Sequence, residues 1–132
     1  MDAATRHFVR RRAGGRCEYC RLPQESFDVS HHVEHIVARQ HGGGDELDNL
    51  ALACHLCNLH KGPNLTGIDP LGAEVALLFH PRRDLWTAHF RFEGVILEGA
   101  TPTGRATVQV LAMNGELQLE LRAALLARGV LL

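Results

Sequence analysis

The sequence predicts an α+β fold, with helices near both ends of the chain and short strands between them. Residues 3–13 and 116–128 carry apolar side chains at helical spacing without Gly or Pro, whereas residues 28–37 alternate as a strand does. A length of 132 residues suits one hydrophobic core and is too short for two independent ones. Two Cys-x2-Cys pairs, Cys17/Cys20 and Cys54/Cys57, enclose the most informative part of the chain.

The first half of the chain predicts a helix, a strand, a turn and a second helix. Residues 3–13 place their few apolar side chains on one side, and two glycines follow them, which predicts a short amphipathic helix. Residues 28–37 are the best strand candidate. Three glycines at 42–44 predict a turn, after which residues 45–52 return the chain. Residues 54–61 then predict a short helix that ends at a Gly-Pro pair.

The second half predicts further strands and two helices. The expected elements are a loop over 64–73, strands over 75–79 and 90–97, a turn-rich segment over 80–86, and helices over 104–113 and 116–128. Thr103 is expected to cap the first of these helices. An Asn-Gly pair separates the two, and the last helix carries Leu117, Leu121 and Leu125 on one face.

Composition excludes several classes of protein. No apolar run approaches the roughly 18 residues that a membrane-spanning helix needs. The first residues carry charge and lack the apolar stretch of a secretory signal. We therefore expect a cytoplasmic protein without a membrane partner, whose four cysteines stay reduced.

Charge is nearly balanced overall but uneven along the chain. The net charge of −1 is not that of a protein that binds nucleic acid by bulk electrostatics. Between Arg6 and Arg21, however, six arginines face a single acid, Glu18. The sequence leaves two interpretations open: a solvated helix face, or a local stripe that contacts phosphate.

The paired cysteines predict a structural zinc site. Two Cys-x2-Cys pairs separated by 33 residues are typical of four-thiolate zinc binding. Four reduced cysteines can also be small buried side chains, and a lone Cys-x2-Cys can be a redox motif, but two pairs at identical spacing favour zinc. Because four protein ligands leave no open position for water, Zn²⁺ bound by Cys17, Cys20, Cys54 and Cys57 is expected to be structural.

A second set of candidate ligands, with oxygen donors, lies between the two cysteine pairs and directly after the second pair. Glu34 offers a carboxylate and Asn58 an amide oxygen, which suits Mg²⁺ or Mn²⁺. His35 stands next to Glu34 and can accept a proton from water near neutral pH. A divalent metal together with such a base predicts a phosphodiester hydrolase.

Taken in order, these residues resemble a known family. The pattern Cys-x2-Cys, Glu-His-Ile, Gly-Gly, Asn-Leu-x3-Cys-x2-Cys-Asn-x2-Lys over residues 17–62 is similar to the HNH endonucleases, the zinc-bearing branch of the ββα-metal nucleases. The resemblance implies a small ββα-metal unit clamped by zinc. The segment that precedes it adds a helix, and the segment that follows it adds an α/β extension.

The resemblance also implies a role for individual residues. His35 matches the general base, Glu34 and Asn58 match ligands of the catalytic metal, and Asn49 matches the asparagine that braces the loop carrying the base. Lys61 lies three residues after Asn58 on the same helix face, where it can touch phosphate. On an ideal strand Glu34 and His35 point to opposite faces, so the strand must end or bulge there.

His32 is the least secure of the candidate ligands. It shares the strand face of Glu34, which makes it a candidate for a third ligand of the catalytic metal. A strand histidine satisfied by hydrogen bonds is the competing interpretation.

The expected function is metal-dependent hydrolysis of DNA phosphodiester bonds, by nicking or by double-strand cleavage. The alternative is a non-catalytic zinc-stabilised module that binds nucleic acid or protein. Residues 1–62 are expected to form the nuclease core with its N-terminal helix, and residues 63–132 an extension packed on that core.

Overall fold

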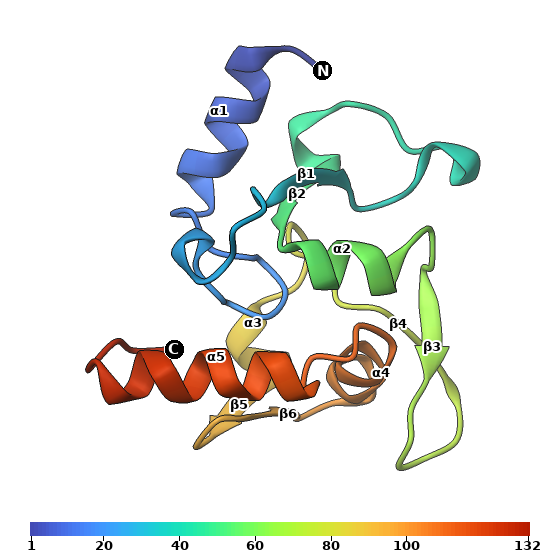
Figure 1. Ribbon diagram of the computed structural model, residues 1–132. Helices are drawn as coiled ribbons and strands as arrows, with labels where there is room; N and C mark the ends of the chain where they lie inside the picture. Colours follow the sequence, from blue (N-terminus) through green and yellow to red (C-terminus); the bar gives the residue numbers. More distant parts are fainter.

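Five α-helices and three two-stranded antiparallel sheets make up the protein in a computed structural model, which describes all 132 residues (Figure 1). The helices are α1 (Ala3–Arg12), α2 (His55–Lys61), α3 (Trp86–His89), α4 (Pro102–Val110) and α5 (Glu116–Ala127). The strands are β1 (His32–His35), β2 (Leu50–Ala53), β3 (Thr66–Ile68), β4 (Val75–Leu77), β5 (Phe90–Glu93) and β6 (Ile96–Gly99). The α+β prediction is confirmed.

Helix α1 forms where the sequence predicts it. The side chain of Asp2 caps its first turn by accepting a hydrogen bond of 2.8 Å from the backbone N–H of Thr5. The helix packs its buried Val9 against Leu50 and Leu52 of β2. A single buried residue anchors α1, so most of its surface stays in solvent.

The β1–β2 hairpin is shorter than the sequence pattern suggests. The strand predicted over residues 28–37 contracts to four residues that pair antiparallel with β2, and His35 lies opposite Leu50. The strand therefore ends at His35, as the placement of Glu34 and His35 at one site requires. The chain then turns through Gly42, whose left-handed φ of 90° closes a short 3-10 turn.

The second half departs from the prediction at two hairpins. The single strand expected over residues 90–97 is a hairpin, because Gly94 adopts a left-handed φ of 59° that allows a two-residue turn between β5 and β6. The loop expected over 64–73 contains β3, which pairs with β4. In neither hairpin does the local sequence pattern reveal which strands pair.

Helix α4 begins earlier than predicted. Thr101, and not Thr103, is its N-cap, and the hydroxyl of Thr101 accepts a hydrogen bond of 3.0 Å from the N–H of Gly104. Pro102 occupies the first helical position, where its fixed φ suits a helix and its missing N–H costs nothing. The prediction overlooked this role of proline.

Helix α5 forms as predicted and buries part of the predicted face, because Leu125 lies in the core and Leu121 packs against it. Leu117 is 48% exposed, whereas Gln118, Arg122 and Leu125 are buried. The guanidinium of Arg122 donates hydrogen bonds to the carbonyl oxygens of Met113, at 2.6 Å, and Val95, at 3.0 Å, and no carboxylate pairs with it. A fully buried cation thus sits in the core without an acidic partner.

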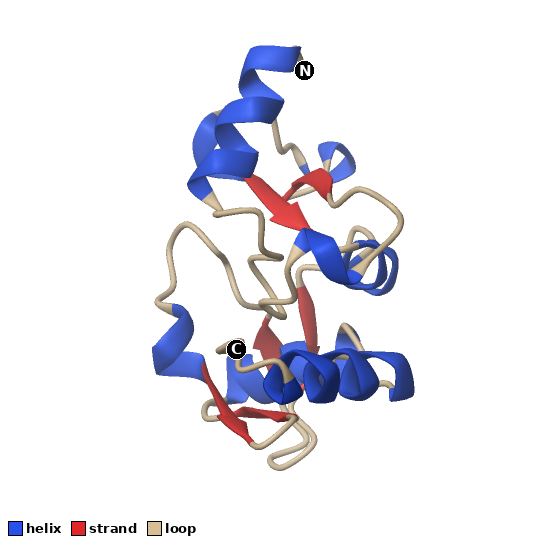
Figure 2. Ribbon diagram, turned by 60° about the vertical axis from the view of Figure 1, so that its left-hand side comes forward, coloured by secondary structure: helices blue, strands red, loops and turns tan.

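One main core joins the two halves of the chain. Figures 1 and 2 place α1 and the β1–β2 hairpin at one end of the molecule and α5 with β5–β6 at the other. The cysteines lie within the hydrophobic cluster between these ends. The cluster also includes Tyr19, Leu22, Ile36, Ala51, Leu78, Phe79, Phe90, Leu97, Ala106, Leu111, Met113 and Leu125. None of the helices has both the length and the apolar character needed to cross a membrane.

Candidate functional site

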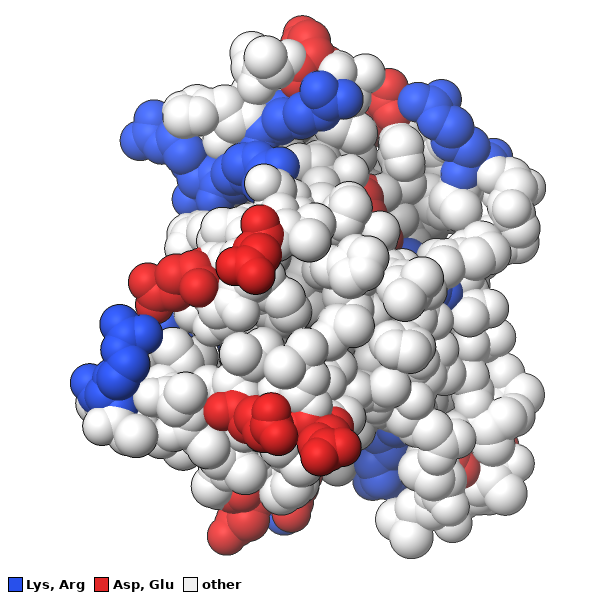
Figure 3. Space-filling model, viewed as in Figure 1, with Lys and Arg blue, Asp and Glu red and all other residues white.

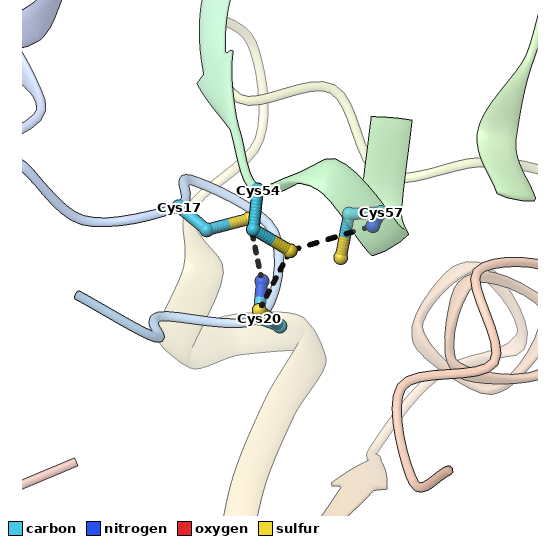
Figure 4. A group of neighbouring side chains, drawn as sticks. All are labelled: Cys17, Cys20, Cys54 and Cys57. Atoms are coloured by element: carbon cyan, nitrogen blue, oxygen red, sulfur yellow. Dashed lines mark hydrogen bonds between the residues drawn. The ribbon is translucent and has the colours of Figure 1, made fainter. Parts of the chain in front are cut away.

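Four cysteine side chains converge where the loop after α1 meets the start of α2 (Figure 4). Their sulfur atoms all lie within 4.8 Å of one another, and all four residues are buried and free of disulfides. Cys54 is the N-cap of α2, and its sulfur accepts the backbone N–H of Cys57 at 3.4 Å. The corresponding contact in the first pair runs from the N–H of Cys20 to the sulfur of Cys17, at 3.5 Å.

The cluster has the dimensions of a tetrahedral zinc site. Sulfur atoms about 2.3 Å from a central Zn²⁺ lie about 3.8 Å apart, and those of Cys20 and Cys54 are 3.7 Å apart. The four-cysteine group therefore fits a structural zinc ion.

A separate groove of about 470 Å³ opens along the free edge of β1. It is lined by His32, Glu34, His35 and Asn58, together with Val33, Ala38, Arg39, Gln40, Gly62 and Pro63. Four of the residues singled out in the sequence thus line one groove. Because β1 pairs only with β2, its other edge is open and side chains of both faces reach the groove.

His35 is held by an acid that the sequence did not single out. Its Nε2 lies 2.6 Å from Oδ1 of Asp45, and the guanidinium of Arg39 donates to the same oxygen at 2.9 Å. The hydrogen bond with His35 holds the pKa of the Asp45 carboxyl below its usual value. An ionised Asp45 accepts the proton on Nε2 and leaves the lone pair on Nδ1 of His35. Spacing gives no sign of this contact, because Asp45 is simply an acid after a glycine turn.

Glu34 is buried and already has two partners. The hydroxyl of Tyr19 donates to Oε1, and the ammonium of Lys61 lies 3.2 Å from Oε2. Burial raises the pKa of Glu34, while the charge of Lys61 opposes that shift. Each carboxylate oxygen keeps one acceptor position beyond these contacts.

Lys61 lies inside the protein and not on the phosphate-accessible surface expected from its spacing. Its side chain is 3% exposed, and its ammonium also donates to the carbonyl oxygen of Ile36 at 2.9 Å. The lysine therefore ties α2 to Glu34 and to the end of β1.

His32 lines the groove and has a ring nitrogen without a hydrogen-bond partner. Its Nε2 is buried and has no hydrogen-bond partner, and its ring stacks obliquely near His55 with centroids 5.9 Å apart. A buried polar atom without a partner is unusual, and a bound ligand is one way to satisfy it. Outside the cysteine cluster, no three His, Cys, Asp or Glu side chains gather closely enough to form a ready metal site.

Asn49 clamps the loop that follows His35. Its Oδ1 accepts the N–H of Val37 at 2.9 Å, and its Nδ2 donates to the carbonyl oxygens of Val37, at 3.0 Å, and Gly44, at 2.8 Å. Gly43 lies so close to this clamp that a Cβ atom there would overlap the carbonyl oxygen of Val37 and approach Nδ2 of Asn49 to 2.8 Å. The clamp and the glycine together fix the loop beside the imidazole.

Replacing Gly43 by alanine tests this arrangement. Gly43→Ala is expected to lower the free energy of unfolding by about 1–3 kcal/mol, because backbone rather than a flexible side chain blocks the new methyl group. Gly44→Ala is the matched control, since the three atoms nearest to a Cβ there belong to the exposed side chain of Glu46, which can turn away. Urea titration of both variants measures the effect, and equal losses would contradict the clamp.

The comparison with protein families agrees with the geometry. Residues 17–64 match the family model described as HNH endonuclease. No curated protein and no solved structure matches the chain. The matched segment holds the cysteine cluster, the β1–β2 hairpin, α2 and the groove. The family indicates a nuclease with a nucleic-acid substrate, and residues 17–64 of this chain are an HNH endonuclease domain built around a buried four-cysteine cluster.

Proposed function

We propose that the protein is a metal-dependent endonuclease that hydrolyses phosphodiester bonds of DNA at the groove along β1. His35 acts as the general base, and Glu34 and Asn58 hold a divalent metal, with His32 as a further ligand. The observation that carries the proposal is the groove itself: it is lined by these four side chains, and Asp45 fixes the imidazole of His35.

The residues around His35 suit proton transfer from water. Nδ1 of His35 takes a proton as the water oxygen attacks phosphorus and the bond from phosphorus to the leaving oxygen breaks. Asp45 keeps the imidazole in the tautomer with a free Nδ1 and stabilises the imidazolium that forms. Asn49 acts only by positioning, because its hydrogen bonds hold the loop after the base.

The groove residues also fit a hard divalent cation. Asn58 offers an amide oxygen, Glu34 retains free acceptor positions, and Nε2 of His32 has no other partner. Bound Mg²⁺ or Mn²⁺ would supply Lewis-acid polarisation of the phosphate and stabilisation of the leaving oxygen. The ammonium of Lys61 donates to Glu34, and its charge lowers the pKa of a carboxyl that burial raises.

The proposal is tested by conversion of supercoiled plasmid to nicked or linear DNA. Purified, zinc-loaded protein is expected to cleave with Mg²⁺ or Mn²⁺ and not without them. A non-catalytic zinc module would bind the plasmid and leave it intact under every metal condition. That outcome would overturn the proposal.

Asp45 provides a second test of the same site. Asp45→Ala is expected to lower the single-turnover cleavage rate on the order of 10²-fold, because the imidazole loses the acceptor that orients it. Asp45→Asn is the matched variant, since its amide oxygen can still accept the proton on Nε2 and should restore part of the rate. Equal rates for wild type and Asp45→Ala, at unchanged DNA affinity, would remove Asp45 from the mechanism.

A further inference from the structure

Positive charge is concentrated at one end of the chain. Residues 1–21 contain six arginines and two acids, whereas residues 22–132 contain eight basic and thirteen acidic residues. Figure 3 shows Lys and Arg gathered over α1, while Asp and Glu dominate the lower half of the same face. A protein with a net charge of −1 thus presents one strongly basic element.

Three arginines of α1 have no partner within the protein. Arg6, Arg10 and Arg11 form no ion pair and no side-chain hydrogen bond. The one acid in the arginine-rich segment, Glu18, is unavailable to them because it pairs with Arg82 and accepts the N–H of Leu52. The charge of these arginines is therefore free to act on a ligand.

A neighbouring arginine fixes α1 to the hairpin. Arg12 donates to the carbonyl oxygens of Leu47, at 2.9 Å, and Leu50, at 2.7 Å, and Leu50 lies directly opposite His35 in the β1–β2 register. Val33, which shares a strand face with His35, packs against the small cluster that holds α1. The helix therefore stands on the side of the hairpin that carries His35.

The exposed surface of α1 also offers apolar contact. Phe8 is 46% exposed, and the guanidinium of Arg12 lies 5.4 Å from the centre of its ring. Ala4, His7 and Arg11 complete a shallow hollow around that ring. Guanidinium groups beside an exposed aromatic ring are suited to a sugar-phosphate chain.

We infer that α1 grips the phosphate backbone of the DNA that is cut at the groove, through Arg6, Arg10 and Arg11. The inference rests on the proposed function for the identity of the ligand. Guanidinium groups bind phosphate oxygens in pairs of parallel hydrogen bonds. The grip is independent of base sequence, so it positions the duplex without choosing the site of cleavage.

The helix dipole offers a simpler explanation for some of the arginines in α1. Arg10 and Arg11 lie in the last turn of α1, where a cation stabilises the negative end of the helix dipole. Arg6 lies a turn earlier and gains little from that effect. A dipole role also alters folding alone, whereas a phosphate grip alters the salt dependence of binding.

The salt dependence of DNA binding separates these roles. Affinity for a fluorescent 20-base-pair duplex would be measured from 50 to 200 mM salt, without added Mg²⁺ or Mn²⁺ so that no cleavage occurs. Each neutralised phosphate contributes about −0.9 to the slope of log K against log [salt], so Arg6, Arg10 and Arg11 changed together to Gln should reduce the slope by about 2.7. Over this salt range the difference amounts to roughly 40-fold in affinity.

A triple variant of Arg83, Arg91 and Arg128 to Gln is the matched control. It removes the same charge from three exposed arginines outside α1, of which Arg91 pairs with Glu98, and is expected to leave the slope within about 0.5 of wild type. Equal slopes for both triple variants, each with full zinc content and an unchanged Tm, would overturn the inference. So would a wild type that does not bind the duplex at 50 mM salt. Binding with the expected slopes but no cleavage would instead reject the nuclease proposal and leave the grip standing.

Discussion

His35→Ala is expected to abolish conversion of supercoiled plasmid by Mg²⁺-loaded protein. General-base catalysis contributes about 10²- to 10⁴-fold to a rate, and His35 is the imidazole that Asp45 orients at the groove. The side chain of His35 is 22% exposed and its hydrogen bond runs to the exposed Asp45, so its loss should leave the fold in place. The single-turnover rate against a defined duplex, compared between wild type and variant, measures the effect.

His41→Ala is the matched control for this experiment. His41 is an exposed histidine in the loop that follows β1, and it forms no side-chain hydrogen bond or ion pair. Cleavage by this variant should equal that of wild type. Acidification should slow wild-type cleavage, because a protonated imidazole cannot accept a proton from water. Cleavage by His35→Ala within tenfold of wild type would exclude His35 as the base.

Cys57→Ser is expected to release zinc and unfold the protein. Structural zinc sites in small domains contribute apparent free energies of about 10–16 kcal/mol, more than the whole stability of a typical domain. Cys57 is buried in the main core, where a hydroxyl cannot replace a thiolate ligand without cost. Zinc stoichiometry and the thermal unfolding midpoint together measure the loss.

Leu59→Ser tests whether the effect is specific to the thiolate. Leu59 lies on the same short helix and is 62% exposed, so this variant should keep its zinc and nearly all of its stability. Chelation of zinc from wild type should reproduce the unfolding seen in Cys57→Ser. A folded Cys57→Ser protein with no bound metal would show that the thiols hold the cluster by packing alone.

Capping residues and ligand spacing made much of the structure in the first half of the chain predictable. Helix α1 has a capping Asp2, and α2 begins at a cysteine and ends at Gly62, so both helices carry their own boundaries in the sequence. The zinc cluster was predictable because ligand spacing is a property of the chain itself. The β5–β6 hairpin was missed because one glycine in an apolar segment does not reveal a turn.

The groove was predictable in its main members but not in its contacts. The order of residue types identified His35, Glu34 and Asn58 as candidates, and they line one groove. The partners of these residues come from distant positions: Tyr19 and Lys61 reach Glu34 across 15 and 27 positions of sequence. No periodicity encodes such pairings, since only the folded chain brings them together.

The buried Arg122 of α5 bears on whether the HNH segment can fold outside this protein. Zn²⁺ bound by four thiolates carries a formal charge of about −2, which is costly to bury without a counter-charge. Burial lowers the pKa of Arg122 and the charge of the four cysteines opposes that shift, so α5 brings a positive charge into the field of the cluster. Because the hydrophobic cluster around the cysteines also contains Phe79, Phe90 and Leu111, we propose that residues 63–132 complete the folding unit that begins with residues 1–62. A graft of residues 17–64 onto another protein would then lose the buried Arg122 and the hydrophobic side chains that enclose the zinc centre.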